Sequence, residues 1–303
     1  MAERAAPGEL RRFLLESQPL RGNWVHLGSA WHELRAHAHY PPLVEALLGE
    51  FATAAVLLAA TLKFEGTLTL QLAGNGRVRL LVAQCSDDFK VRAVAHHDIA
   101  ADELPDFATL VGEGRLTVTV QSETTSARYQ GIVPLAGASL AECLENYFAS
   151  SEQLPTRLLL AADAEQAAGL LLQKLPGQSA SGEGAGAQLQ QTWEELQSGL
   201  MAMPAASLLS DDAEQAVRQV AGAHDCRLFA PTLVSFSCRC SAQRVADVLR
   251  SLGVEEARAT LAEQGVLLVQ CEFCNREYRY DAVDVEQLFA DEANLQQGSD
   301  AVN

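Results

Sequence analysis

The chain has 303 residues, 48% of them apolar and 20% charged, which is typical of a globular protein and enough for two domains joined by a connection. Its formal net charge of −17 argues against nucleic acid or an anionic membrane as the main partner, because both require clustered Lys and Arg. The simplest role of this charge is solubility.

No segment predicts secretion or membrane insertion. Residues 1–13 carry charges and lack the apolar run of a secretory signal. The most apolar stretch, 51–62, is too short and too closely flanked by charge to cross a bilayer. We therefore expect a cytoplasmic protein, in a compartment where permanent disulfides are rare and clustered cysteines bind metals or react with oxidants.

The first part of the chain predicts helices followed by antiparallel strands. Segment 42–63 begins with paired prolines and has apolar residues at helical spacing, so we expect a long helix there. From Gly66 the apolar period changes to two, and Asn75-Gly76 provides a tight turn between two strands. We expect short helices at 10–17, 30–36 and 139–148, and further strands at 89–95, 115–121, 128–135, 156–162 and 170–174.

After Pro176 the composition changes. Residues 177–186 are mostly Gly, Ser, Ala and Gln, which is typical of a flexible linker. Residues 193–223 return to helical spacing with few apolar positions, and Asp211 and Glu214 can cap a helix there. Helices of this kind depend on docking against another surface.

The last block contains most of the cysteines, with helices expected at 241–252, 254–263 and 284–289 and strands at 266–269 and 278–280. The predicted class is α+β. The four predicted parts are an N-terminal core domain with an antiparallel sheet at 1–176, a helical linker at 177–231, a small four-cysteine zinc domain at 232–290, and a disordered tail at 291–303.

Cys238, Cys240, Cys271 and Cys274 form a C-x-C pair and a C-x-x-C pair with thirty residues between them. C-x-x-C is the short turn that places two sulfurs on one metal, and C-x-C adds two more from another loop. All-sulfur ligation favours zinc, with an iron–sulfur cluster as the main rival. No histidine follows Asp225, so we expect one zinc ion in a closed four-cysteine site, whose ordinary role is structural.

A block of this size barely folds on its apolar core alone, whereas a structural zinc contributes on the order of 10 kcal/mol or more. Removing the metal should therefore unfold it. Oxidation within each local pair would close only very small loops, while the metal joins segments thirty residues apart. Local disulfides would replace a long-range link by two weak ones, whereas cross-pairing would keep the link and defeat such a switch.

Further motifs accompany the cysteines over most of the chain. They are Leu62-Lys63-Phe64-Glu65-Gly66, Gly74-Asn75-Gly76, Thr109-Leu110-Val111-Gly112-Glu113-Gly114, Arg128-Tyr129-Gln130-Gly131, Tyr147-Phe148, and Ser151-Glu152-Gln153-Leu154-Pro155-Thr156-Arg157. Through these motifs and the two cysteine pairs, the chain resembles the redox-regulated, ATP-independent holdase chaperones, the 33 kDa heat-shock protein family of bacteria.

The resemblance implies a core domain, a metastable helical linker and a C-terminal zinc domain that senses oxidants. Family members are monomeric and inactive while reduced and zinc-bound. Peroxide or hypochlorous acid, with unfolding stress, forms the local disulfides (Cys238–Cys240 and Cys271–Cys274 here), expels zinc and unfolds sensor and linker. The activated form binds unfolding client proteins and tends to form a homodimer. A chaperone, and no enzyme, is implied.

Three points stay open on the residues alone. Cys226 lies outside the family pattern, as a buried linker residue or as an extra thiol that mispairs. A zinc-ribbon nucleic-acid-binding regulator is weakened by six Arg, no Lys and nine acidic residues in 231–290, a net of −3. A thiol–disulfide oxidoreductase would use Cys271-x-x-Cys274, but the thioredoxin-like βαβ unit that such enzymes have is not found.

Overall fold

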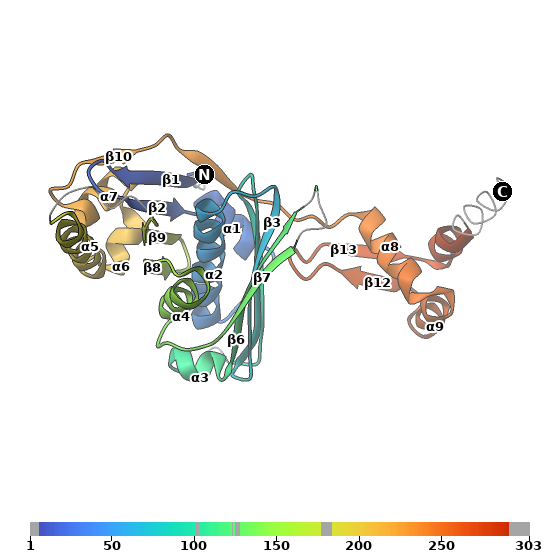
Figure 1. Ribbon diagram of the computed structural model, residues 1–303. Coiled ribbons are helices and arrows are strands. Elements are labelled where there is room, and N and C mark those ends of the chain that lie inside the picture. The colour runs from blue at the N-terminus through green and yellow to red at the C-terminus, as the bar shows by residue number, and fades with distance from the viewer. Residues whose placement is uncertain (1–5, 101–102, 123, 125–127, 177–183, 291–303) are drawn as a thin grey trace. The chain divides into compact units, whose positions relative to one another are not determined.

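The computed structural model describes residues 6–100, 103–122, 124, 128–176 and 184–290. It divides into two compact units, Met1–Ser237 and Cys238–Asn303 (Figure 1). The further division of the first unit into core and linker stays a prediction. The flexible segment expected at 177–186 lies largely outside the described residues, with helix already formed from Ala185, and the tail expected at 291–303 lies wholly outside them.

The elements of both units follow one another in this order. The first unit contains β1 (Gly8–Leu15), β2 (Leu20–His26), α1 (Ser29–Arg35), α2 (Pro42–Thr61), β3 (Gly66–Gly74), β4 (Val78–Ser86), β5 (Lys90–His97), α3 (Phe107–Val111), β6 (Gly114–Ser122), β7 (Arg128–Pro134), α4 (Leu140–Tyr147), a π-helical turn (Phe148–Glu152), β8 (Thr156–Ala162), β9 (Ala167–Lys174), α5 (Ala185–Met201), α6 (Ala205–Ser210), α7 (Ala213–Ala221), β10 (Cys226–Leu228) and β11 (Thr232–Phe236). The second contains α8 (Ala242–Leu252), α9 (Val254–Gln264), β12 (Leu267–Gln270), β13 (Glu277–Tyr280) and a helix at 282–290.

One eleven-stranded sheet runs through the first unit in the order β7-β6-β3-β4-β5-β11-β1-β2-β9-β8, with β10 beside β1. Its pairs are antiparallel except for β11 and β5, which are parallel. The predicted hairpin of β3 and β4 is present, and the N–H of Gly76 in its turn donates to the carbonyl oxygen of Val111 at 3.1 Å. The predicted α+β class is confirmed.

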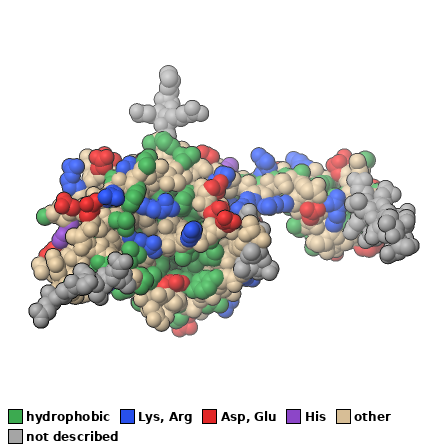
Figure 2. All heavy atoms as spheres, turned by 45° about the horizontal axis from the view of Figure 1, so that its top comes forward, with side chains coloured by type: hydrophobic (Ala, Val, Ile, Leu, Met, Phe, Trp, Pro, Cys, Tyr) green, Lys and Arg blue, Asp and Glu red, His purple; other side chains and the backbone are tan. Residues whose placement is uncertain are grey.

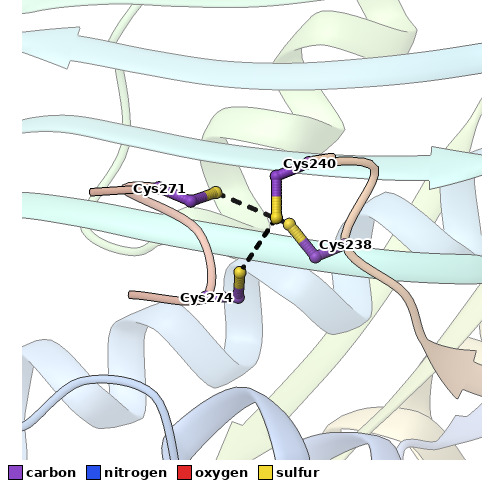
Figure 3. Close-up of side chains that lie close together, drawn as sticks. All are labelled: Cys238, Cys240, Cys271 and Cys274. Atoms are coloured by element: carbon purple, nitrogen blue, oxygen red, sulfur yellow. Dashed lines mark hydrogen bonds between the residues drawn. The ribbon is translucent and has the colours of Figure 1, made fainter. Parts of the chain in front are cut away.

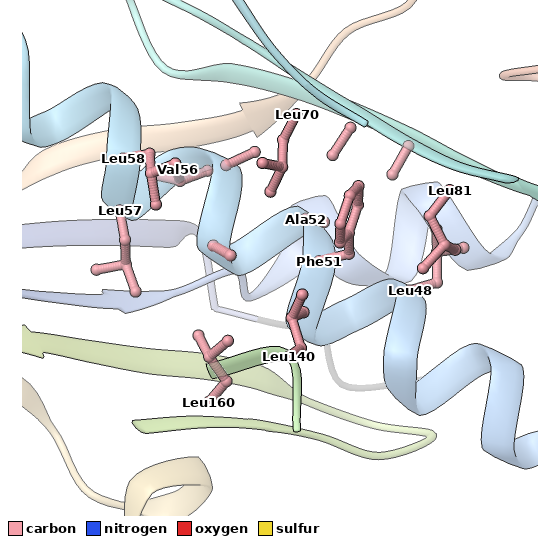
Figure 4. Packing of buried hydrophobic residues seen from close by; sticks show 14 of the residues in the cluster. Leu48, Phe51, Ala52, Val56, Leu57, Leu58, Leu70, Leu81, Leu140 and Leu160 are labelled. Atoms are coloured by element: carbon pink, nitrogen blue, oxygen red, sulfur yellow. The ribbon is translucent and has the colours of Figure 1, made fainter. Parts of the chain in front are cut away.

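Helix α2 is the centre of the main core. Figure 4 shows it between two layers, with Leu70 and Leu81 of β3 and β4 on one side and Leu140 and Leu160 of α4 and β8 on the other. Within the described residues it is the one helix long and apolar enough to cross a membrane, but 78% of its most apolar window is buried in the protein. The apolar character of α2 is thus explained by its place in the core. The expectation that this segment does not cross a membrane was based on the short length of 51–62, and that was not the right reason.

Shortening Phe51 tests this core. Phe51 of α2 is fully buried, and Phe51→Ala is expected to lower the free energy of unfolding by about 3–5 kcal/mol, because the cavity it leaves adds to the lost apolar burial. Denaturant titration followed by tryptophan fluorescence measures this change, since all three tryptophans lie in the first unit. A loss below about 1 kcal/mol would contradict a central position for α2.

A second core lies on the opposite face of the strands that run from β1 to β8. Phe13, Trp24 and Leu170 of β1, β2 and β9 contact the buried faces of α5, α6 and α7. The helices contribute Trp193, Leu196, Leu200, Leu208, Val217 and Val220, and the connection between α5 and α6 contributes Met203. The segment predicted to depend on docking is therefore docked. The Nε2 atom of His224 lies 2.7 Å from a carboxylate oxygen of Glu195 on α5.

Two helical details of the prediction are wrong. Segment 10–17 forms most of strand β1, because Leu10 packs in the main core while Phe13 packs in the second one, and a strand buried on both faces loses the alternation that identifies strands. Helix α7 is capped by Asp212, in a capping box with Gln215, one residue after the predicted pair Asp211 and Glu214.

Candidate metal centre

The C-x-C pair lies where the chain enters α8. Ser241 caps this helix by accepting a hydrogen bond from the N–H of Arg244 at 3.2 Å. The Arg244 side chain then donates to the carbonyl oxygen of Arg239 at 2.9 Å, the residue between the two cysteines. The loop that presents Cys238 and Cys240 is thereby tied to the start of a regular helix.

The C-x-x-C pair lies in the turn between β12 and β13, as predicted. The N–H of Cys271 donates to the carbonyl oxygen of Arg276 at 3.0 Å, and its carbonyl accepts from the N–H of Asn275 at 2.7 Å. Asn275 has a φ of 50°, a left-handed conformation that asparagine tolerates better than most residues. A turn of this shape points both thiols to one side. Thioredoxin-like enzymes instead place this motif at the start of a helix.

The four side chains converge on one point (Figure 3). Their sulfur atoms all lie within 4.8 Å of one another. The Sγ atoms of Cys238 and Cys271 are 3.6 Å apart, and those of Cys240 and Cys274 are 3.3 Å apart. A tetrahedral metal with metal–sulfur bonds of about 2.3 Å needs sulfur atoms about 3.8 Å apart. The predicted cysteines are therefore brought together as a set that could bind one metal ion.

The thiols affect one another's protonation. Burial acts to raise the pKa of Cys238, but the backbone N–H of Cys240 and the neighbouring thiols outweigh it and lower the pKa to about 7. Burial raises the pKa of Cys271 and of Cys274, and the neighbouring Cys238 adds to this. All four sulfurs become thiolates together when a cation is present to compensate their charge.

Tyr278 of β13 places its hydroxyl group beside the cysteine cluster. Its hydroxyl group is buried and, within the described ranges, has no hydrogen-bond partner of standard geometry. It nevertheless has two polar neighbours: Cys240 raises the pKa of the phenol, and the side chain of Arg276 lowers it. A metal-bound thiolate is an acceptor for such a hydroxyl group. The sequence did not single out Tyr278, although the alternation of Tyr278 and Tyr280 with Glu277 and Arg279 was a signal that both tyrosines lie on the inward face of the strand.

Removing this hydroxyl group should weaken metal binding without unfolding residues 238–290, here called the metal module. We expect Tyr278→Phe to lower the metal affinity by about tenfold, through loss of a hydrogen bond to the Cys240 thiolate. Competition with a coloured chelator measures the affinity. Tyr280→Phe is the matched control, because the Tyr280 hydroxyl group donates to the carbonyl oxygen of Ala242 at 3.3 Å instead. Equal losses in the two variants would contradict the assignment.

The metal module has a small apolar core. Its buried residues are Val245, Ala246, Leu249, Ala257, Leu267, Val285 and Leu288. On the same module Val248, Leu252 and Val283 are exposed, so much of its apolar surface is not used for folding. Seven buried side chains provide little of the free energy that ordering such a module costs, and a metal cross-link is the natural complement.

The other three cysteines lie away from this cluster. Cys85 and Cys143 are buried in the first unit, and burial raises the pKa of both. Cys226 begins β10 and is half-buried against the second core. Burial and the adjacent Asp225 raise its pKa to about 11, which keeps it a thiol at neutral pH. This favours a packing role for Cys226 over that of a reactive extra thiol.

Comparison with known proteins gives a consistent result. Residues 8–281 match the family described as Hsp33 protein. The proteins named 33 kDa chaperonin from Nitrosococcus oceani and Pseudomonas paraeruginosa are 40% and 43% identical over 285 and 282 residues, covering 93% and 92% of this chain and 94% of each relative. The crystal structure of the 33 kDa chaperonin (heat shock protein 33 homolog) from Thermotoga maritima has the same fold, with a TM-score of 0.80 at 23% identity over 94% of this chain and 99% of that one.

Proposed function

The chain belongs to the Hsp33 protein family, so its role is that of a chaperone, and we propose that it is a redox-regulated, ATP-independent holdase. In this function it binds unfolding client proteins through apolar surface and prevents their aggregation. The observation that carries the proposal is the four-thiol cluster, which joins two segments of a module with a small core. Such a module stays folded only while its thiols share a metal.

The metal in this proposal is zinc, one ion per chain, held in the reduced protein by Cys238, Cys240, Cys271 and Cys274. Four thiolates with no open position form the donor set typical of a structural zinc site. When bound, zinc supplies the cross-link between the C-x-C loop and the C-x-x-C turn. The buried hydroxyl group of Tyr278 fits the same donor set.

Oxidation removes these donors. As each local pair forms its S–S bond, the pair gives up two electrons, and one hydrogen peroxide accepts them with two protons to yield two waters. Two peroxides therefore convert four thiolates into Cys238–Cys240 and Cys271–Cys274. The two sulfur–sulfur contacts given above join opposite segments, so proximity alone does not select local pairing. Loop size does favour it as a switch, since only local disulfides release the segments from each other.

Release of the docked helices would supply the client-binding surface. Helices α5–α7 cover Phe13, Trp24 and Leu170 of the sheet, and their own apolar side chains become accessible when they leave it. Figure 2 shows apolar side chains between charged ones already on the surface of the larger unit. Undocking would enlarge the apolar area into a surface that holds clients without directional contacts.

The proposal includes the remaining expectations from the sequence. The reduced form would be a monomer and the oxidised form a homodimer, in the cytoplasm, with unfolding proteins as partners and neither nucleic acid nor membrane. The charge of −17 supports this choice of partners. The turn position of Cys271-x-x-Cys274 supports a metal site over a thiol–disulfide oxidoreductase.

Oxidation at elevated temperature tests the proposed function. We expect peroxide to release one zinc per chain and the product to suppress the aggregation of a heat-denatured protein at near-stoichiometric ratio. The reduced protein, at the same temperature and concentration, should leave the aggregation unchanged. Loss of metal without any effect on light scattering by the client would refute the holdase function.

A further inference from the structure

Strand β11 lies inside the sheet although it comes late in the chain. It pairs in parallel with β5, through Ser235 with Lys90 and Phe236 with Val91. It pairs antiparallel with β1, where Val234 lies opposite Gly8. Among the described strands it is the one that joins the two halves of the sheet. Its last residue, Phe236, is separated from Cys238 by Ser237 alone.

The position that β11 fills, here called the β11 slot, binds mainly backbone. On the β5 side, the N–H of Ser235 donates to the carbonyl oxygen of Phe89 and that of Ser237 to the carbonyl oxygen of Val91, both at 3.2 Å. Only two side chains of the strand face the main core. Val234 is 1% exposed, and the ring of Phe236 packs 5.1 Å from that of His37. Leu233 points outward and is 62% exposed.

The walls of the β11 slot also contact each other directly. The guanidinium group of Arg12, on β1, lies 5.3 Å from the centre of the Phe89 ring, just before β5. On the β1 side, a Cβ atom at Gly8 would come within 2.6 Å of the carbonyl oxygen of Val234, so the absence of a side chain at this position allows the close approach of the two backbones. The slot is thus shaped for a strand and has a contact of its own that does not depend on β11.

Few contacts hold β11 in the sheet. The strand has five residues and a single fully buried side chain. The segments before and after it, α5–α7 and the metal module, are those that the proposed function unfolds on oxidation. With both flanking segments disordered, β11 keeps only its backbone hydrogen bonds to the neighbouring strands and the burial of Val234. A strand held this weakly leaves the sheet frequently.

We propose that the β11 slot is a docking site for an extended segment of an unfolding client, which replaces β11 in the activated protein. This inference rests on the proposed function. It identifies one part of the client-binding surface and the kind of segment that binds there. The main-chain hydrogen bonds of β5 and β1 would provide affinity independent of sequence, as in other cases of strand addition. The apolar pockets of Val234 and Phe236 would provide selectivity.

The slot defines what such a segment must contain. It needs apolar side chains two residues apart, in the places of Val234 and Phe236, and backbone N–H groups in the places of Ser235 and Ser237. Proline in the place of Ser235 removes a donor and is excluded. Extended segments of this kind are buried in folded proteins and exposed in unfolding ones, which explains selection of unfolding clients.

Amide hydrogen exchange in the full chain locates the event. We expect the backbone amides of segments 8–10 and 90–91 that face the β11 slot to be protected in the reduced protein and to exchange about a hundredfold faster after oxidation. Adding a heat-denatured client should restore their protection, while segment 68–72 of β3 stays protected throughout. Protection that is never lost, or that no client restores, overturns the inference. If client aggregation is still suppressed in that experiment, the holdase function stands and the β11 slot has no part in it.

A peptide provides the specificity test. The probe is a fluorescent peptide with the sequence of residues 230–237, and the control is the same peptide with Ser235→Pro. The oxidised protein should bind the probe, the control should bind at least about tenfold more weakly, and the reduced protein should bind neither. Equal binding of both peptides overturns the inference. So does protection that returns without client as the protein dimerises and is lost again on dilution, because a second copy would then fill the slot.

Discussion

Removing the metal from the reduced protein is expected to unfold residues 238–290 and to leave the main core of the first unit folded. The apolar core of the module has only seven buried side chains, with Tyr278, Tyr280 and Phe289 partly buried against it, whereas a four-thiolate zinc site contributes on the order of 10 kcal/mol or more. A strong chelator under reducing conditions should therefore raise amide exchange across α8, β12 and β13 to the rates of an unfolded chain. Segments in β3, β4 and α2 should keep their protection.

A pair of serine variants separates the site from general effects of cysteine loss. Cys271→Ser removes one donor from the cluster and should produce the same unfolding without a chelator. Cys226→Ser makes the same chemical change outside the cluster and should leave zinc stoichiometry and exchange unchanged. A module that stays protected in Cys271→Ser would show that its apolar core suffices.

Introducing a charge under α5 is expected to activate the protein without an oxidant. Leu196 is fully buried between α5 and the sheet, and a carboxylate in its place, Leu196→Asp, would destabilise the docked helices by about 3–5 kcal/mol. The helices should leave the sheet, with a shift of tryptophan emission to longer wavelength, because Trp193 and Trp24 both lie in this contact. The variant should suppress client aggregation while it retains one zinc per chain.

The matched control adds the same charge at an exposed position of α5. Gln188 is exposed, and Gln188→Asp should change neither emission nor aggregation. A Leu196→Asp protein whose helices undock but which does not bind a client would show that the covered surface is not the client-binding surface. In that case the oxidised form would have to use another surface.

The sequence was sufficient for the elements with one clear period. Helix α2 has apolar residues at helical spacing after two prolines, and the β3–β4 hairpin has strict alternation around Asn75-Gly76, so both were predicted with nearly correct bounds. The four cysteines of the metal centre were identified because their spacing carries the chemistry directly. These features depend on local sequence, which a single chain displays.

The features that could not be predicted from the sequence depend on contacts between segments far apart in the chain. Strand β1 was predicted as a helix because its apolar residues are divided between two cores, with Leu10 in the main core and Phe13 and Leu15 in the second, and neither core is local in sequence. Strand β11 was not predicted at all, since its partners β5 and β1 lie more than a hundred residues earlier in the chain. The proximity of Tyr278 to Cys240 likewise depends on how β13 and the C-x-C loop meet.

Disulfide mapping of the oxidised protein, combined with zinc stoichiometry and amide exchange on the same sample, tests the central claim most directly. The account predicts Cys238–Cys240 and Cys271–Cys274 disulfides, loss of the single zinc ion and fast exchange across 242–280. Disulfides between opposite segments, Cys238–Cys271 and Cys240–Cys274, in a module that stays protected would contradict it. The metal module would then remain folded after oxidation, and disulfide formation could not switch the protein on.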